Sequence, residues 1–255
     1  MPSAPPTSTF ATLLDATRAA LADPGDTKQA FRIADALSFD TPARLARRMR
    51  ASPTGGPLLA RRDDLLPVLC DRARLEAMPE DSLGRAYLRF LDSEGITAAG
   101  LVQASMDGVD ATTVDGLDPD VRWMRERMRD THDLWHTVTG YRGDLLGEAS
   151  LLAFTFAQTG HPGVGFLAGL GLVLGNLPGA RRLVTRGFLR GRRARWLPGV
   201  DWLALLPRPL DEVRRELGID EPPAYEPVRE RTPWLARRLR ARRTSVQAAA
   251  ALHPA

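Results

Sequence analysis

Four side chains of this sequence have the types and the spacing needed to bind a metal ion: His132, Asp133, His136 and Glu148. The chain has only four histidines, and two of them are one helical turn apart with a carboxylate beside the first. Residues at i, i+3 and i+4 share a helix face, so His136 can meet both His132 and Asp133 around one small object. Two imidazoles and two carboxylates suit a divalent metal ion, whose charge the carboxylates balance.

The surrounding sequence predicts the helices that position these residues. Asp118 and Pro119 are suited to the N-cap and the first position of a helix. Apolar residues then recur at roughly helical intervals as far as Val138, and Gly140 is a natural stop. The first three ligands therefore fall near the carboxyl end of this helix. A glycine-rich turn follows, and we expect Glu148 to open a second helix that folds back toward them.

Other interpretations of the same residues are open. A His-Asp pair near a helix end can be a cap or a surface ion pair, because cations favour that end. The doublet also suggests metal phosphohydrolases, but these use a further upstream histidine and none precedes His132. Zinc proteases place a glutamate general base between two helical histidines. Asp133 is one methylene shorter and would reach a metal-bound water poorly, so a protease remains only an alternative.

Composition limits the class of protein. The chain has 255 residues, of which 44% are hydrophobic and 26% charged, as in an ordinary globular domain with tails. The single cysteine, Cys70, excludes an internal disulfide framework and fits a reducing compartment. Since no nearby residue resembles a base, we expect Cys70 to be a small core residue.

Positive charge is concentrated in two segments, Arg181–Arg195 and Arg237–Arg243. The formal net charge is +4, and nearly all of the positive charge is arginine, with Lys28 the only lysine; together with the abundant Ala, Gly and Pro this is typical of a GC-rich bacterium. The sequence has no nucleic-acid reader module and no stacking aromatic series, so we expect no nucleic-acid partner. An anionic membrane surface is the favoured partner of the two segments.

The two ends of the chain are predicted to lie outside the folded domain. Residues 1–9 are rich in Pro, Ser and Thr and are expected to be a disordered tail, without the features of a signal or transit peptide. Residues 229–255 are expected to form a basic C-terminal helix and tail. The domain between them then covers residues 10–228.

A long segment between Glu148 and Arg181 has no charged residue, and its second half, Gly163–Leu177, is apolar on all sides. A membrane span needs about 20 such residues, and the Gly-His-Pro-Gly sequence ending at Gly163 interrupts the run. We therefore expect a buried core helix. The alternative is a helix whose small Gly and Ala residues leave room for a long apolar ligand.

Three blocks of the sequence together resemble the coenzyme Q (ubiquinone) biosynthesis family that acts at ring carbon 1 and was described mainly as the organiser of the quinone-making complex. The family signature His-Asp-x-x-His, eleven residues, then Glu is present as His132, Asp133, His136 and Glu148. The upstream block Ser82–Ile96 contains Leu-Gly-x-x-Tyr-x-x-x-Leu. The downstream block, Leu210–Tyr225, resembles the closing helix and proline turn of the family.

The resemblance implies an all-α fold, a single multi-helix domain that binds one divalent metal ion through His132, Asp133, His136 and Glu148. Zinc is the expected ion, and ferrous iron would suit an oxidative reaction. The implied reaction is metal-dependent decarboxylation at ring carbon 1 of a polyprenylated 4-hydroxybenzoate, with or without oxidation at that carbon. Glu148, Arg129 and Tyr141 are the expected catalytic residues, and the groups expected to orient the substrate carboxylate are Arg129, Tyr141 and Arg142.

A different class of function is also compatible with the resemblance. The chain could be a non-catalytic lipid-binding scaffold that gathers other quinone-biosynthesis enzymes at the membrane. In either case the expected partners are a polyprenylated aromatic acid, these other enzymes and an anionic membrane, and a homodimer is an open alternative for assembly. The expected location is a bacterial cytoplasm, at the inner face of the cell membrane.

Overall fold

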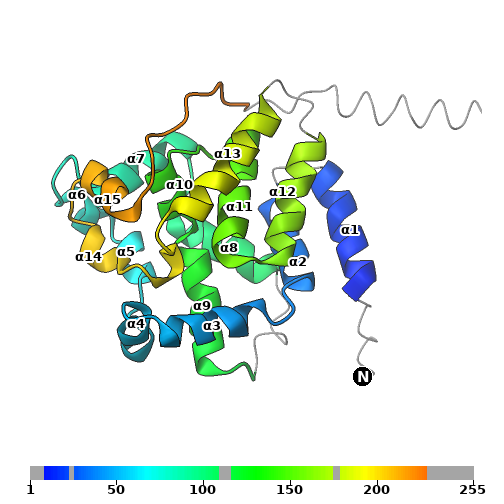
Figure 1. Ribbon diagram of the computed structural model, residues 1–255, viewed down its shortest axis with the longest axis horizontal. Helices are drawn as coiled ribbons and strands as arrows, with labels where there is room; N and C mark the ends of the chain where they lie inside the picture. The colour runs from blue at the N-terminus through cyan, green and yellow to red at the C-terminus, as the bar shows by residue number, and fades with distance from the viewer. Residues whose placement is uncertain (1–8, 23–25, 109–115, 175–178, 229–255) are drawn as a thin grey trace, which may run out of the picture.

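The computed structural model describes residues 9–22, 26–108, 116–174 and 179–228 (Figure 1). Within these ranges the chain forms fifteen α-helices and one short 3-10 helix, without a β-strand, which confirms the all-α single domain. The helices, in chain order, are α1 (Thr9–Ala22), α2 (Thr27–Ala36), α3 (Thr41–Ala51), α4 (Gly55–Arg61), α5 (Leu66–Cys70), α6 (Arg72–Glu76), α7 (Leu83–Glu94), α8 (Ala98–Gly108), α9 (Pro119–Asp130), α10 (His132–Thr139), α11 (Leu145–Thr159), α12 (Pro162–Leu174), α13 (Ala180–Arg193), the 3-10 helix η2 (Leu197–Gly199), α14 (Trp202–Leu205) and α15 (Leu210–Leu217).

The predicted tails fall almost entirely outside the described residues. The exception is Thr9, which the sequence assigned to the disordered tail and which is the first residue of α1. The predicted basic C-terminal helix, within residues 229–255, lies beyond the last described residue.

The main hydrophobic core lies between α7, α10, α11, α13, α14 and α15. Trp135 and Phe154 pack there edge to face, with ring centroids 6.2 Å apart. Helices α11 and α13 lie side by side (Figure 1), and their backbones approach closely through glycine. A Cβ at Gly187 would lie only 2.3 Å from the carbonyl oxygen of Ser150, and one at Gly191 only 2.5 Å from that of Phe154. This close contact holds α11 firmly in the core.

The single helix predicted from Pro119 to Gly140 is two helices, and this expectation is therefore corrected. The break is at Thr131, whose hydroxyl donates to the carbonyl oxygen of Arg127 at 2.8 Å. The two halves bury their apolar faces in different places. Trp123 and Met124 of α9 pack against α3 and α4, whereas α10 packs into the main core. The predicted start is confirmed, because Asp118 caps α9.

Two expectations about burial are wrong. Of the predicted buried helix, Gly163–Leu177, residues 175–177 lie outside the described residues. The described part, within α12, packs on α11 and α2 but leaves Phe166 37% exposed, so it is not enclosed in the core. Cys70 is exposed, because it is the last residue of the short α5, which buries Leu69 instead. Partial burial and two nearby carboxylates raise the pKa of the Cys70 thiol, which disfavours the thiolate. No helix in the described ranges is both long and apolar enough to span a bilayer.

Candidate metal centre

The four predicted ligands come from α10 and α11, which a short turn connects. His132 is the first residue of α10, and His136 lies one turn further along it. The helix ends at Gly140, whose φ of +74° is a left-handed conformation that glycine adopts without strain. Glu148 lies in the first turn of α11, so the chain reverses and brings its carboxylate to the two imidazoles.

Helix α11 begins at Leu145, three residues before the predicted start at Glu148. The difference is due to Asp144, the N-cap, whose carboxylate accepts the backbone N–H groups of Leu146 and Gly147. Glu148 therefore lies within the first turn of the helix, where its backbone is more constrained than it would be at the first residue.

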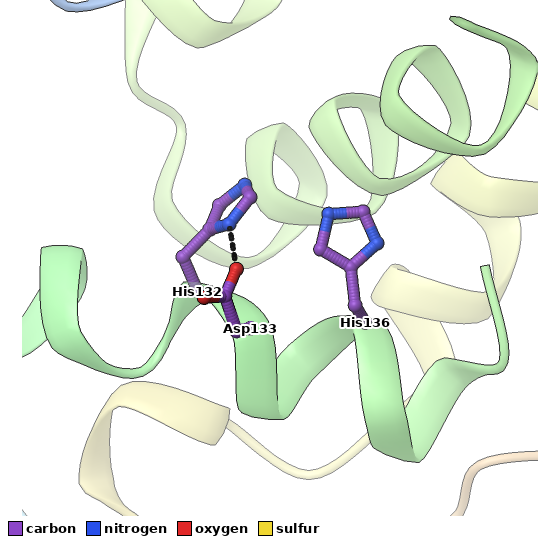
Figure 2. A group of neighbouring side chains, drawn as sticks. All are labelled: His132, Asp133 and His136. Atoms are coloured by element: carbon purple, nitrogen blue, oxygen red, sulfur yellow. Dashed lines mark hydrogen bonds and ion pairs between the residues drawn. The ribbon is translucent and has the colours of Figure 1, made fainter. Parts of the chain in front are cut away.

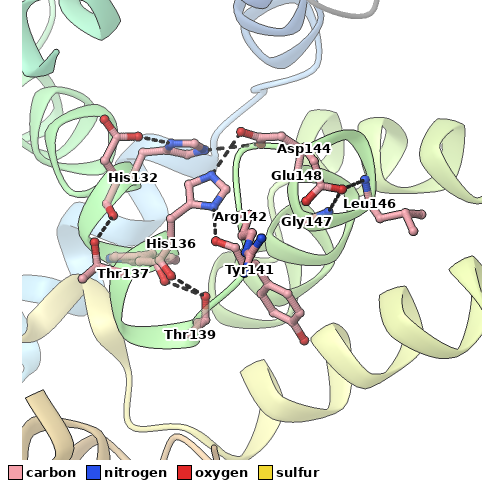
Figure 3. Close-up of polar contacts among 12 residues, drawn as sticks. His132, His136, Thr137, Thr139, Tyr141, Arg142, Asp144, Leu146, Gly147 and Glu148 are labelled. Atoms are coloured by element: carbon pink, nitrogen blue, oxygen red, sulfur yellow. Dashed lines mark hydrogen bonds and ion pairs between the residues drawn. The ribbon is translucent and has the colours of Figure 1, made fainter. Parts of the chain in front are cut away.

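The imidazoles of both histidines point at the carboxylate of Glu148, as Figure 3 shows. The distance from His136 Nε2 to Glu148 Oε1 is 3.1 Å, and that from His132 Nε2 to Glu148 Oε2 is 3.9 Å. One donor atom each from His132, Asp133 and His136 also lie within 4.8 Å of one another (Figure 2). The structure thus groups the donor atoms of His132, Asp133 and His136, and it places the carboxylate of Glu148 beside the Nε2 atoms of the two histidines.

A further contact orients each histidine. His136 Nδ1 lies 2.9 Å from the carbonyl oxygen of Tyr141, to which it donates when protonated there, and this leaves Nε2 free for a metal ion. His132 Nδ1 lies 3.1 Å from Asp133 Oδ1, so Asp133 orients His132 as well as offering oxygen ligands. The side chains of His136 and Asp133 are buried, whereas those of His132 and Glu148 are 29% and 39% exposed. The centre is therefore accessible from the side of His132 and Glu148.

The electrostatics of the cluster match a site for a cation. Burial opposes protonation of His132, but its hydrogen bond to Asp133 and the charges of Glu148 and Asp133 outweigh burial and raise its pKa to about 9. Burial likewise opposes ionisation of Glu148, but the charge and hydrogen bond of His136 and the charge of His132 lower its pKa to about 2. The carboxylates thus favour positive charge between the two rings, which a divalent ion would supply in place of protons.

The donor set fits a divalent metal ion. Its nitrogen donors are imidazoles, one with its second nitrogen hydrogen-bonded to a backbone carbonyl, as is usual for metal-binding histidines. Its oxygen donors are carboxylates, and the mixture accepts zinc or ferrous iron.

Two of the expected carboxylate-orienting residues, Arg129 and Tyr141, are placed differently. The guanidinium of Arg129 pairs with Asp130 at 2.7 Å. The ring of Tyr141 points away from the imidazoles (Figure 3) and is buried in the main core, where its hydroxyl has no hydrogen-bond partner among the described residues. Tyr141 therefore reaches the centre through its carbonyl oxygen and not through its phenol. Trp135, between the ligands in sequence, is a core residue.

Several residues that support the centre were missed by sequence reasoning. The ring of Phe90 on α7 stacks on His136, with centroids 5.1 Å apart. The buried Arg190 donates to the carbonyl oxygen of Thr139 at 3.0 Å, and Arg214 to that of Val138 at 2.9 Å. These two guanidinium groups donate hydrogen bonds to carbonyls at the end of α10, and their positive charge interacts favourably with the negative end of the helix dipole. Arg190 and Arg214 belong to α13 and α15, and no local sequence pattern predicts their contacts with α10.

Comparison with known proteins identifies relatives across most of the chain. The family described as coenzyme Q (ubiquinone) biosynthesis protein Coq4 matches residues 3–223. The mitochondrial ubiquinone biosynthesis protein COQ4 of Yarrowia lipolytica is 32% identical over 188 residues, 71% of this chain and 67% of that protein. The mitochondrial COQ4 homolog of Danio rerio is 32% identical over 213 residues, 80% of this chain and 74% of that protein.

A solved structure has the same fold. It is the crystal structure of a protein described as a ubiquinone biosynthesis protein from Nostoc punctiforme, with a TM-score of 0.60 and 24% sequence identity. The match covers 84% of this chain and all of that one, and it supports the helical fold.

Proposed function

Because this chain belongs to the Coq4 family of ubiquinone biosynthesis proteins, we propose that it acts in that pathway as a metal-dependent decarboxylase. The proposed substrate is a polyprenylated 4-hydroxybenzoate, which loses its carboxyl group at ring carbon 1. The observation that carries the proposal is the convergence of the His132 and His136 Nε2 atoms on the carboxylate of Glu148. Zinc is the proposed ion, with ferrous iron as the alternative.

Decarboxylation breaks the bond between ring carbon 1 and the carboxyl carbon, and the bonding electrons stay on the ring. Without an oxidant, the ring carbon takes up a proton and carbon dioxide leaves. With dioxygen as a two-electron oxidant, a hydroxyl group takes the place of the carboxyl group: the acid, dioxygen and water give the phenol, carbon dioxide and hydrogen peroxide. The ring must therefore be stabilised while its charge changes, and a bound divalent cation would supply Lewis acidity for this.

The described residues then have distinct roles. His136, held by the carbonyl oxygen of Tyr141, keeps one Nε2 donor fixed. Glu148 lies on the accessible side and stays ionised there, because the two histidines lower its pKa to about 2. Its negative charge would hold the cation, and the proton for the ring carbon would come from solvent on this side. Arg129, one turn before His132, is the proposed partner of the substrate carboxylate, and it would exchange Asp130 for that group.

A direct assay tests this function. The metal-loaded protein is incubated with a polyprenylated 4-hydroxybenzoate, with and without dioxygen, and carbon dioxide and the ring product are measured. We expect one carbon dioxide for each ring product. A product with hydrogen at carbon 1 indicates the non-oxidative route, and one with a hydroxyl group there indicates the oxidative route. Absence of both products from metal-loaded protein would contradict the proposal and favour the scaffold alternative, in which the metal serves structure.

A membrane surface is the proposed location, at the inner face of a bacterial cell membrane where a polyprenyl substrate would reside. Helix α13 has many arginines and no acidic residue. Arg182, Arg186, Leu189 and Arg193 lie on one face of it and are exposed, with Leu189 47% exposed. Basic groups around an apolar side chain suit an anionic lipid surface, with other quinone-biosynthesis enzymes gathered on the same membrane.

Replacing Arg182, Arg186 and Arg193 with glutamine should weaken binding to anionic liposomes about 100-fold at low salt, since each basic group contributes about 1 kcal/mol. Flotation over a salt series measures this. A matched control removes the same charge from another surface, where each arginine already has a carboxylate or carbonyl partner: Arg72, Arg85 and Arg89. Equal effects of the two triple variants, or binding that is independent of salt, would contradict the proposed surface.

A further inference from the structure

We propose that residues 219–228, here called the C-terminal strap, position the metal centre, with Tyr225 as the positioning residue. The proposal rests on the metal centre proposed above. The strap follows α15 as an extended segment without helix, drawn in orange in Figure 1. It lies against the turn between α10 and α11, which contains the Tyr141 carbonyl and leads to Glu148.

The hydroxyl of Tyr225 links two points of this turn. It donates to Asp144 Oδ2 at 2.7 Å and accepts the backbone N–H of Arg142 at 2.9 Å. Burial and the hydrogen bond to Asp144 raise the pKa of Tyr225, so its hydroxyl stays protonated and remains a donor. One side chain of the strap therefore fixes both the N-cap of α11 and the backbone beside Tyr141.

Asp144 transmits this contact to Glu148. It is 4% exposed, and its Oδ1 accepts the backbone N–H of Val228, in the strap, at 3.0 Å as well as those of the first turn of α11. Its carbonyl oxygen accepts the backbone N–H of Glu148 at 2.8 Å. The strap, the cap and the ligand thus form one connected set of hydrogen bonds.

Packing between the strap and the turn leaves no room for adjustment. A Cβ at Gly147 would lie 2.6 Å from the hydroxyl of Tyr225 and 2.0 Å from the carbonyl oxygen of Arg142. A Cβ at Gly140 would lie 2.4 Å from the ring of Pro222. At the start of the strap, Arg190 donates to the carbonyl oxygen of Asp220 at 2.7 Å. The strap is therefore held at Asp220, Pro222, Tyr225 and Val228.

The consequence for the metal centre is geometric. His136 depends on the Tyr141 carbonyl for its orientation, and Glu148 depends on the first turn of α11 for its reach. Both lie in the segment that Tyr225 holds. Without the Tyr225 hydroxyl the four ligand side chains remain, but the frame that sets their separation is loosened. Loss of such supporting contacts typically weakens metal binding 10- to 100-fold.

The test is Tyr225→Phe, which keeps the ring and removes only the hydroxyl. In the full chain we expect zinc affinity, measured by competition with a chelator, to fall about 10- to 100-fold. Amide hydrogen exchange in residues 140–148 should become at least about tenfold faster. With cobalt in place of zinc, the visible spectrum should shift, because it reports coordination geometry.

Two further variants separate positioning from a general loss of stability. Asp118→Ala removes a comparable N-cap from α9, outside the cluster, and should change none of the three measurements. Asp144→Ser keeps a helix cap but removes the partner of Tyr225, so it should reproduce the effect of Tyr225→Phe and add little to it in the double variant.

Four results of these measurements would overturn the positioning role of Tyr225. Zinc affinity that is equal in Tyr225→Phe and wild type overturns the positioning role, even if exchange is faster. If amide hydrogen exchange in residues 140–148 is unchanged in Tyr225→Phe, the strap does not hold the turn and the proposal is overturned. If Asp118→Ala loses as much zinc affinity as Tyr225→Phe, the effect is one of general stability. Failure of the wild-type protein to bind zinc or cobalt overturns the proposed metal centre and the positioning role together.

Discussion

Replacing His136 with alanine is expected to reduce bound metal from about one ion per chain to less than about a tenth of that, because a site with three or four protein ligands rarely survives the loss of one. His136 is the most constrained donor of the centre. Its side chain is 1% exposed, its Nδ1 lies against the Tyr141 carbonyl, and Phe90 stacks on its ring. Elemental analysis of protein purified without added metal or affinity tag measures the loss.

The chain offers a matched control in His161, which lies outside the cluster. Burial and the nearby charge of Arg125 lower the pKa of His161 to about 4, so it is a neutral imidazole. His161→Asn should therefore retain the metal content of the wild type. Zinc in the wild type favours the non-oxidative reaction, and iron favours the oxidative one. A wild-type protein without metal, or a His136→Ala variant that keeps it, would leave the four residues as a polar cluster and support the scaffold.

Replacing Glu148 with glutamine is expected to lower turnover by about 10³-fold while the fold is kept. Glutamine has the same shape and can still accept a hydrogen bond from His136, so the helix start and the core should be undisturbed. It loses the negative charge that faces both imidazoles on the accessible side of the centre. Turnover, metal binding and fold are measured separately on the same preparation by product formation, metal content and circular dichroism.

Glu212→Gln is the control for loss of one carboxylate charge. Glu212 lies on α15, where its side chain is 49% exposed and pairs only loosely with Arg208 at 3.8 Å. This variant should have wild-type turnover. A Glu148→Gln protein that is unfolded would show a structural role, and one with full activity would contradict the catalytic role. A folded variant that keeps its metal and loses turnover would exclude the scaffold alternative.

Much of the side-chain arrangement of the candidate metal centre could be predicted from the sequence because its spacing is local. On any α-helix, a histidine and an aspartate at i and i+1 share a face with a histidine at i+4, so the cluster of His132, Asp133 and His136 follows from helix geometry. The start of α9 at Asp118 and Pro119 is equally local, since capping depends on the neighbouring backbone alone. The all-α fold followed from the family resemblance of three blocks.

What the sequence could not determine depends on contacts between distant segments. The helix break at Thr131 separates α9, which packs mainly against α3 and α4, from α10 in the main core, and the periodicity of the two halves is nearly continuous. Tyr141 has a carbonyl at the centre and a phenol in the core, and only the path of the backbone decides which part of a residue faces a site.

The tertiary structure alone also supplied the frame of the centre. Tyr225 meets Asp144 across 81 residues, and Arg190 meets Thr139 across 51. Such contacts have no periodicity, because a tyrosine or an arginine can serve equally well on a surface or in a core. The sequence by itself determined which side chains could bind a metal ion. The packing of α13 and the C-terminal strap against the turn decided how these side chains are held, because orientation is set by hydrogen bonds and steric fit between segments that meet only in the folded chain.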